Sequence, residues 1–212
     1  MIRVAFIAAY CLCCWPIDAM AQKECAPSPA EQNFWDNVKN SENPQELVEF
    51  RKQFPTGCYF KLAGIRLENK VPSTIPFNVS VHKAGGGNEA FQGGQQISNG
   101  GASYHSLTIA SNAKSKVAFE YRCDGAGVGL SPWISDGSTC NGGQAIQGFE
   151  VRTIGPLANY YDLKVECTTI EIGNQNQSGV STVGNSQWCG VKAGAGPRWV
   201  NNIKISLTRK PF

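Results

Sequence analysis

From Pro76 onward, apolar and polar residues alternate in short runs separated by glycine, asparagine and serine. Strict alternation places every second side chain on the same face, which predicts half-buried β-strands. Three longer runs are each followed by a glycine-rich loop and later by a closing run. The apolar positions are Phe77, Val79 and Val81; Val117, Phe119 and Tyr121; Tyr161, Leu163 and Val165; and, in the closing runs, Leu107 and Ile109; Phe149 and Val151; Ile203, Ile205 and Leu207.

Matching runs recur at a period of about 40 to 50 residues, which is typical of a repeat architecture. We therefore expect a β-domain over residues 71–212 with three hairpin repeats, at about 76–112, 116–155 and 160–208. The predicted fold class is mostly β, with the three repeats in a pseudo-threefold, prism-like or trefoil-like arrangement. Neighbouring repeats would bury their apolar faces against one another.

Residues 22–70 instead have helical patterning and predict a small N-terminal α-helical cap. The first helix begins at Ser28, with Pro29 in its first turn and Glu31 completing a capping box. A second helix begins at Asn43 and a third runs from about Tyr59 to Leu67. Apolar side chains share one face of the first two helices: Phe34, Trp35, Val38, Leu47, Phe50 and Phe54. We expect Trp35 to be structural.

The first 21 residues have the composition of a secretory signal peptide. Arg3 precedes an apolar run that is too short to span a bilayer, and Ala19-Met20-Ala21 provides small residues for cleavage. The residues before the leader cysteines are not the small ones that lipoprotein processing favours. We predict a secreted or periplasmic protein with no membrane span after cleavage.

Nine cysteines fall into two groups, three in the leader (Cys11, Cys13 and Cys14) and six after it. In an oxidising compartment, spaced pairs indicate disulfides rather than metal ligands or redox centres. Two pairs fall at matching strand and loop positions of the second and third repeats, and the remaining pair encloses the helical cap. The predicted disulfides are Cys25–Cys58, Cys123–Cys140 and Cys167–Cys189.

The mild net charge and the lack of metal-binding motifs after the leader argue against several classes of function. The formal net charge is +3, from 19 Lys and Arg against 16 Asp and Glu, which is too mild to indicate nucleic acid or a membrane surface. No C-x-x-C motif or Cys/His cluster with zinc spacing follows the leader. The two histidines, His82 and His105, are expected to be surface or cross-strand residues. We expect no cofactor and no metal.

The helical cap carries a pattern of its own: Glu31, Phe34-Trp35, Ser41, Pro44, Phe54-Pro55, Gly57, Leu62-Ala63 and Arg66-Leu67. This pattern resembles the short helical segment that accompanies the protease domain in many bacterial caspase-like proteins. There the segment is a linker or an interaction module. The His-Gly and Gln-Ala-Cys-x-Gly motifs of the protease itself do not occur in this chain.

Residues 117–207 resemble two tandem units of the bacterial hydrophobic-W repeat family, known from clostridial surface proteins. The first unit reads Tyr121, Gly129-Leu130, Trp133, Asp136-Gly137, Gly143 and then Ile146 to Arg152. The second is degenerate, since Val180 and Val183 stand where tryptophans are expected, although Gly179 and Arg198 remain. Leu130 also replaces a tryptophan. The resemblance implies surface attachment or recognition.

Aromatic side chains in loops are the best candidates for ligand contact, because a flat apolar ring beside polar groups suits a sugar. The opposing interpretation is that the rings fill the core between hairpins. The ligand-binding candidates are Trp133, Asp136, Tyr121, Trp188, Arg198 and Trp199.

The predicted function is therefore non-catalytic binding of a carbohydrate or cell-envelope polymer. A first alternative is a protein-interaction or surface-attachment module that uses the helical cap through Phe34, Val38 and Leu47. A second alternative is a glycoside hydrolase that uses two carboxylates, which would be fixed by geometry that sequence does not show. Its candidates are Asp124, Asp136, Glu150, Asp162 and Glu166, with Asp136 the first to test.

Overall fold

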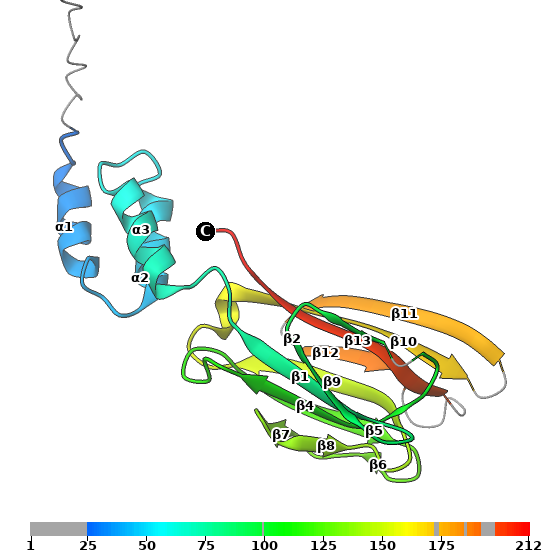
Figure 1. The fold of residues 1–212 in the computed structure, drawn as a ribbon. Coiled ribbons are helices and arrows are strands. Elements are labelled where there is room, and N and C mark those ends of the chain that lie inside the picture. The colour runs from blue at the N-terminus through cyan, green and yellow to red at the C-terminus, as the bar shows by residue number, and fades with distance from the viewer. Residues whose placement is uncertain (1–24, 99, 172–173, 185, 192–197) are drawn as a thin grey trace, which may run out of the picture.

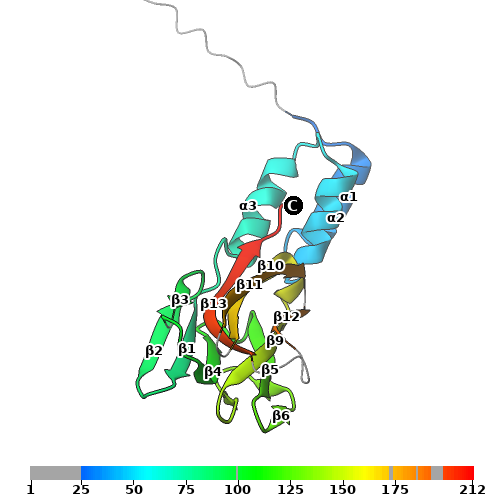
Figure 2. The same ribbon diagram turned by 90° about the vertical axis from the view of Figure 1, so that its right-hand side faces the viewer.

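A computed structural model describes residues 25–98, 100–171, 174–184, 186–191 and 198–212. The protein is mostly β, with three short helices at one end and three antiparallel sheets (Figures 1 and 2). The predicted signal peptide lies outside the described residues. Within them, no helix has the length and apolar character needed to cross a membrane.

The helical cap consists of α1 (Pro29–Val38), α2 (Pro44–Gln53) and α3 (Phe60–Lys70). Both predicted capping residues are confirmed: Ser28 Oγ accepts from the backbone N–H of Glu31 (3.1 Å) and Asn43 Oδ1 accepts from that of Gln45 (3.1 Å). α3 continues three residues beyond the predicted end at Leu67, because no helix breaker occurs before Pro72. Trp35, 5% exposed, packs inside the cap as expected.

Glu31 makes a different contact from the one that a capping box implies. Its carboxylate accepts from the backbone N–H of Tyr59 (2.9 Å), the N-cap residue of α3. No side chain of α3 itself caps that helix. A carboxylate near a helix N-terminus also interacts favourably with the helix dipole. Glu31, only 4% exposed, therefore joins the first helix to the third.

The sheets are built around the six predicted strands, all of which are present. In the first sheet the order is β2 (Asn88–Gln92), β1 (Phe77–Lys83), β4 (Tyr104–Ser111) and β8 (Thr139–Asn141). In the second it is β12 (Ser186–Gly190), β9 (Ile146–Ile154), β5 (Ala118–Gly125) and β6 (Gly129–Leu130), with β7 (Ile134–Ser135) also paired to β5. In the third it is β11 (Asn174–Gly184), β10 (Tyr161–Glu171), β13 (Arg198–Arg209) and β3 (Gln96–Ser98), after a short 3-10 helix at Ala158–Tyr160.

Each sheet contains one edge strand that comes from a distant segment of the chain. β8 follows β7 of the second sheet in sequence but pairs with β4 of the first sheet. β12 follows β11 but pairs with β9 of the second sheet, and β3 follows β2 but pairs with β13 of the third. These short strands have no strong periodicity, so the sequence pattern does not predict them.

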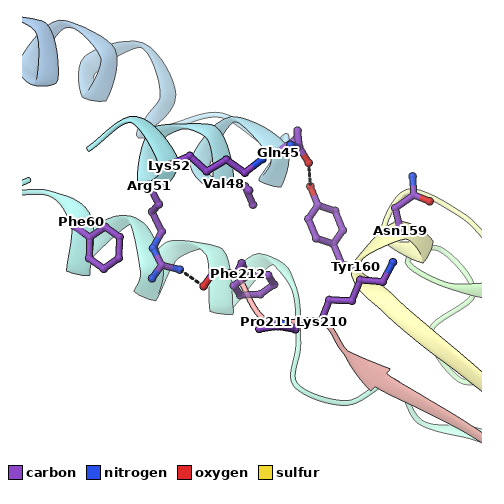
Figure 3. Close-up of a pocket in the computed structure, with 10 residues that line it drawn as sticks. All are labelled: Gln45, Val48, Arg51, Lys52, Phe60, Asn159, Tyr160, Lys210, Pro211 and Phe212. Atoms are coloured by element: carbon purple, nitrogen blue, oxygen red, sulfur yellow. Dashed lines mark hydrogen bonds between the residues drawn. The ribbon is translucent and has the colours of Figure 1, made fainter. Parts of the chain in front are cut away.

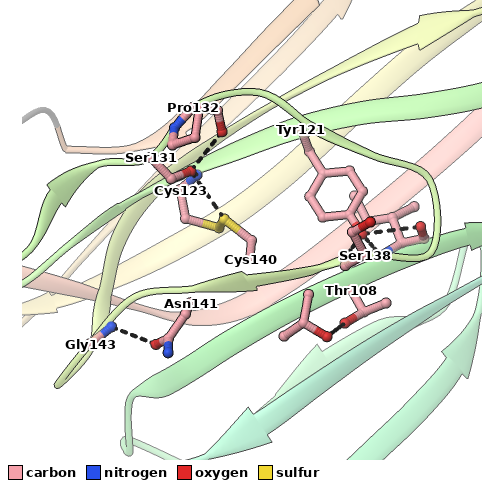
Figure 4. The surroundings of a disulfide bond; sticks show 11 residues. Thr108, Tyr121, Cys123, Ser131, Pro132, Ser138, Cys140, Asn141 and Gly143 are labelled. Atoms are coloured by element: carbon pink, nitrogen blue, oxygen red, sulfur yellow. Dashed lines mark hydrogen bonds between the residues drawn. A yellow bond between two sulfur atoms is a disulfide. The ribbon is translucent and has the colours of Figure 1, made fainter.

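One apolar core joins the three sheets. The inward residues of β1, β4, β5, β9, β10 and β13 form a single buried cluster, as their alternation predicts. All three predicted disulfides are present. Cys140 on β8 links one distant edge strand to β5 through Cys123 (Figure 4). Cys189 on β12 links a second distant edge strand to β10 through Cys167. Val117 is a small exception to the strand prediction, because it lies in a turn before β5 and packs with the cap.

The cap packs against one end of the sheets through a second apolar cluster. Tyr161 and Leu157 contribute to this cluster together with residues of all three helices. The segment after β13 returns to the cap, where Arg51 Nη1 donates to the carbonyl oxygen of Phe212 (2.8 Å; Figure 3). A pocket of about 370 Å³ remains at this junction, beside Tyr160 and Lys210. The cap and the sheets therefore share contacts from both ends of the described chain.

Glu31 provides a test of the link between α1 and α3. Glu31→Ala leaves the Tyr59 N–H without its acceptor and should lower the free energy of unfolding by about 1–3 kcal/mol. Glu42→Ala is the matched control, because Glu42 is 95% exposed and its ion pair with Lys70 should contribute little. Chemical denaturation of both variants measures the difference. Equal stability of the two variants would contradict the assigned role.

Candidate functional site

The outer face of the second sheet carries a compact set of charged residues. Glu120 and Arg122 alternate on β5 with buried residues, and Glu150 and Arg152 do the same on β9. The strand register places Arg122 opposite Glu150 and Glu120 opposite Arg152. We call these four residues and Trp133 the platform.

Two ion pairs cross the platform between β5 and β9. Arg122 Nε and Nη2 both donate to Glu150 Oε2, at 2.9 and 2.7 Å. Arg152 Nε donates to Glu120 Oε2 at 2.8 Å, and its Nη2 lies 2.6 Å from the same oxygen. Directly opposed cross-strand pairs of opposite charge stabilise a sheet. Their charges also balance, so the platform has no net charge.

Trp133 lies over both guanidinium groups. Its ring centroid is 4.7 Å from Cζ of Arg122 and 4.2 Å from Cζ of Arg152. The neighbouring strand β7 is paired to β5, with Ile134 opposite Tyr121, which holds the tryptophan at the edge of this face. Cation–π contacts with two paired arginines fix the position of the indole. Trp133 is nevertheless only half-buried and remains accessible.

Trp188 lies on the same face at the opposite edge. β12 places it opposite Glu150, so that Trp188, Glu150, Arg122 and Trp133 follow one another across the sheet. Its indole N–H donates to the carbonyl oxygen of Gly190 (3.1 Å). The ring lies so close to Gly148 that a Cβ there would be 2.5 Å from Trp188 Cζ2. Glycine is therefore required beneath this ring.

A buried carboxylate lies beside these residues. Asp124 is directly opposite Gly148 in the register and is only 2% exposed. Among the residues that the structure describes, none forms a hydrogen bond with its Oδ1. A buried polar group without a partner is costly, and such groups are rare in folded proteins. Asp124 is therefore a buried carboxylate next to the row that ends at Trp188, and it is closed to solvent.

Two of the predicted ligand-binding residues have structural partners instead. Tyr121 is fully buried, and its hydroxyl accepts from the backbone N–H of Ile109 (2.9 Å) and donates to the carbonyl oxygen of Ser138 (Figure 4). Burial raises the pKa of the Tyr121 hydroxyl to about 12. The Asp136 carboxylate accepts from the backbone N–H groups of Ser111 and Phe119, at 3.0 to 3.1 Å. Both side chains hold β4 to the segment that contains β5 and β7.

The other two predicted residues lie on a different sheet. Arg198 and Trp199 belong to β13, where they are opposite Glu171 and Ile170 of β10. Both are half-buried. Of the six candidates, Trp133 and Trp188 therefore share one face of the second sheet, at its opposite edges. Val180 and Val183 lie on β11, in a segment whose side chains fall outside the described set.

The carboxylates nominated for hydrolysis are spread over the sheets. Glu150 and Asp136 have the contacts given above, and Asp162 lies 3.7 Å from Lys210. Glu166 lies between Lys164 and Lys204 on the third sheet. Hydrogen bonding from Lys164, then from Lys204, lowers the pKa of Glu166 and keeps it ionised.

The residues proposed for the cap's interaction surface are largely unavailable. Val38 is 3% exposed and Leu47 is fully buried, while Phe34 is partly covered. The exposed apolar residues of the cap are instead Leu62 and Ile65 on α3, at 42% and 56% exposure. Helical periodicity identified the packing face correctly but did not separate it from a binding face.

Arg122 and Arg152 were missing from the candidates that the sequence suggested. Their alternation with apolar residues, which can be read from the sequence, marks them as outward-facing. Their opposition to Glu150 and Glu120 depends on the strand register, which the sequence does not reveal. The aromatic contact of Trp133 depends on the same register.

No protein-family model matches the chain, and searches of curated proteins and of solved structures found no match either. The geometry of the site is thus the basis for the functional argument. Both resemblances noted from the sequence stay predictions.

Asp136 tests whether a carboxylate at this position is structural. Asp136→Ala removes the acceptor of two backbone N–H groups and should lower the free energy of unfolding by about 3 kcal/mol. Asp162→Ala is the control, since its side chain is 41% exposed. Denaturation curves of the two variants provide the comparison. Wild-type stability of Asp136→Ala would remove the structural assignment and return Asp136 to the list of functional candidates.

Proposed function

We propose that this protein is an exported, non-catalytic binding module for carbohydrate, including the glycan polymers of a cell envelope. The observation that carries the proposal is the position of Trp133 over the guanidinium groups of Arg122 and Arg152, at 4.7 and 4.2 Å. A half-buried indole that is already fixed loses little side-chain entropy when a ligand stacks on it.

The polar groups around the ring suit a sugar. Aromatic rings contact the apolar face of a pyranose, while hydroxyl groups need donors and acceptors at its edge. Glu120 and Arg152 provide both kinds of group, with side-chain exposures of 28% and 42%.

The charge balance of the platform argues against anionic ligands. Two arginines are paired with two glutamates at 2.6 to 2.9 Å, so no guanidinium is left over for a phosphate or a nucleic acid. The three disulfides support export, because such bonds persist in oxidising compartments.

A protein partner for the helical cap is the second candidate function. It is favoured by the exposed apolar residues Leu62 and Ile65 on α3. The hydrophobic-W resemblance is compatible with either candidate, since it implies surface recognition of an unspecified kind.

We also propose that the β-domain arose from three copies of one hairpin unit with pseudo-threefold symmetry. The support comes from the distant edge strands, because each of the three sheets receives one from a different hairpin unit. Corresponding residues on these strands are opposite corresponding core residues: Ile97 opposite Ile203, Cys140 opposite Leu107, and Cys189 opposite Phe149. Val81 is in turn opposite Leu107, as Cys123 is opposite Phe149 and Cys167 opposite Ile203. The pair Val81 and Ile97 thus occupies the positions at which each of the other two units has its disulfide.

The binding proposal is tested with Trp133→Ala in a glycan and cell-wall binding screen. For any ligand that the wild type retains, loss of the stacking surface should weaken affinity at least tenfold, equivalent to about 1.4 kcal/mol. Leu130→Ala is the matched control, because Leu130 is apolar, 48% exposed and on the neighbouring strand β6. It should bind like the wild type.

Two outcomes would overturn the carbohydrate proposal. One is the absence of any glycan ligand for the wild type in the screen. The other is equal affinity of wild type and Trp133→Ala for a ligand that the wild type retains. Loss of binding only in a Leu62→Ser/Ile65→Ser variant would favour the protein-partner function of the cap.

The repeat proposal predicts a disulfide that the natural chain lacks. If the first unit is a true copy, Val81→Cys/Ile97→Cys should form a bridge, because the corresponding cysteines have Cα–Cα distances of 6.0 and 6.1 Å. Peptide mapping of the unreduced variant, exported to an oxidising compartment, detects the bridge. Two free thiols in a folded protein would contradict the equivalence.

A further inference from the structure

The chain has two histidines, and the fold places them side by side. His82 lies on β1 and His105 on β4, and their ring centroids are 6.0 Å apart. Both side chains are partly exposed on the outer face of the first sheet. Their separation in sequence hides this pairing, and no metal-binding motif marks it.

A β-bulge brings His105 to this face. His82 is opposite Ser106, but the next residue, Lys83, is opposite Tyr104, so His105 is the extra residue between them. The bulge leaves Tyr104 and Leu107 both buried while His105 and Ser106 stay partly exposed. Bulges commonly redirect a side chain next to a functional site.

Asn88 fixes the tautomer of His82. Its side-chain oxygen Oδ1 lies 2.8 Å from Nδ1 of His82. A carbonyl oxygen can only accept, so Nδ1 donates its hydrogen and the lone pair of the neutral ring is on Nε2. Histidines that bind metals usually donate their other ring N–H to an oxygen in this way.

We propose that His82 and His105 bind a divalent transition-metal ion such as Zn²⁺ or Ni²⁺. A nitrogen–metal distance of about 2.1 Å places an ion about 3.2 Å from each ring centroid, so two rings that share one tetrahedral ion lie about 5.2 Å apart. The observed 6.0 Å exceeds this separation by about 0.8 Å, which small rotations of the two partly exposed side chains would close. Imidazole is a preferred ligand of these ions, whereas Mg²⁺ and Ca²⁺ prefer oxygen.

A polar pocket of about 430 Å³ lies on the His82 side of the pair. Hydroxyl groups of Ser80, Ser106 and Thr108 line this pocket beside His82. In the described part of the chain, no three side chains of His, Cys, Asp or Glu gather in one place. The site therefore has two protein ligands, and its open positions can accept an oxygen of a hydroxyl group or of a small ligand. This function is independent of the platform on the second sheet.

The test is a titration of the protein from Gln22 onward with ZnCl₂ and NiCl₂, followed by calorimetry and by NMR of the imidazole nitrogens. We expect one ion per chain, with stoichiometric shifts of both imidazoles and no response to MgCl₂. His82→Gln or His105→Gln should weaken binding at least tenfold. Asn88→Ala should weaken it about tenfold while both rings still respond. Gln92→Ala, an exposed residue on β2, is the control and should bind like the wild type.

Zinc and nickel affinities of the His82→Gln/His105→Gln variant equal to those of the wild type would overturn the site. A wild type in which neither imidazole shifts at saturating metal would do the same. Circular dichroism of each variant verifies that the fold is retained. Failure of this test leaves the glycan result unaffected, because Trp133 and the two histidines lie on different sheets.

Discussion

The rest of the structure depends on the pairing of three short strands with sheets from distant segments of the chain. β3, β8 and β12 each complete a sheet to which their own hairpin does not belong. Because of this exchange, each sheet completes its backbone hydrogen bonds only when a strand from another part of the chain is also in place. One apolar cluster then extends through all three sheets. Two of the three strands are also held covalently, through Cys140 and Cys189.

The candidate carbohydrate site is a direct product of that pairing. Trp188 reaches the outer face of the second sheet because β12 pairs with β9 there. Trp133 reaches the same face from the other edge, where β7 pairs with β5. The two ion pairs between β5 and β9 occupy the space between the tryptophans and hold Trp133 in place. The sheet thus provides a rigid support, and side chains of opposite charge provide its polar groups.

Local patterns in the sequence were sufficient for the main elements. Alternation located β1, β4, β5, β9, β10 and β13, capping residues located α1 and α2, and spacing gave all three disulfides. Long-range register could not be predicted in this way. It is register that puts Arg122 opposite Glu150, and a bulge that puts His105 beside His82. The same limitation explains why Tyr121 and Asp136 were proposed as ligand contacts, since their backbone partners come from β4 and its neighbours.

The central claim is that the outer face of the second sheet binds carbohydrate through Trp133, and the indole N–H signals test it most directly. After the predicted leader is removed, the chain retains four tryptophans: Trp35, Trp133, Trp188 and Trp199. In a titration with a glycan selected by binding, the signals of Trp133 and Trp188 should shift together, while that of Trp35 in the cap core stays fixed. Shifts confined to Trp199 or Trp35, with Trp133 unchanged at saturation, would contradict the account.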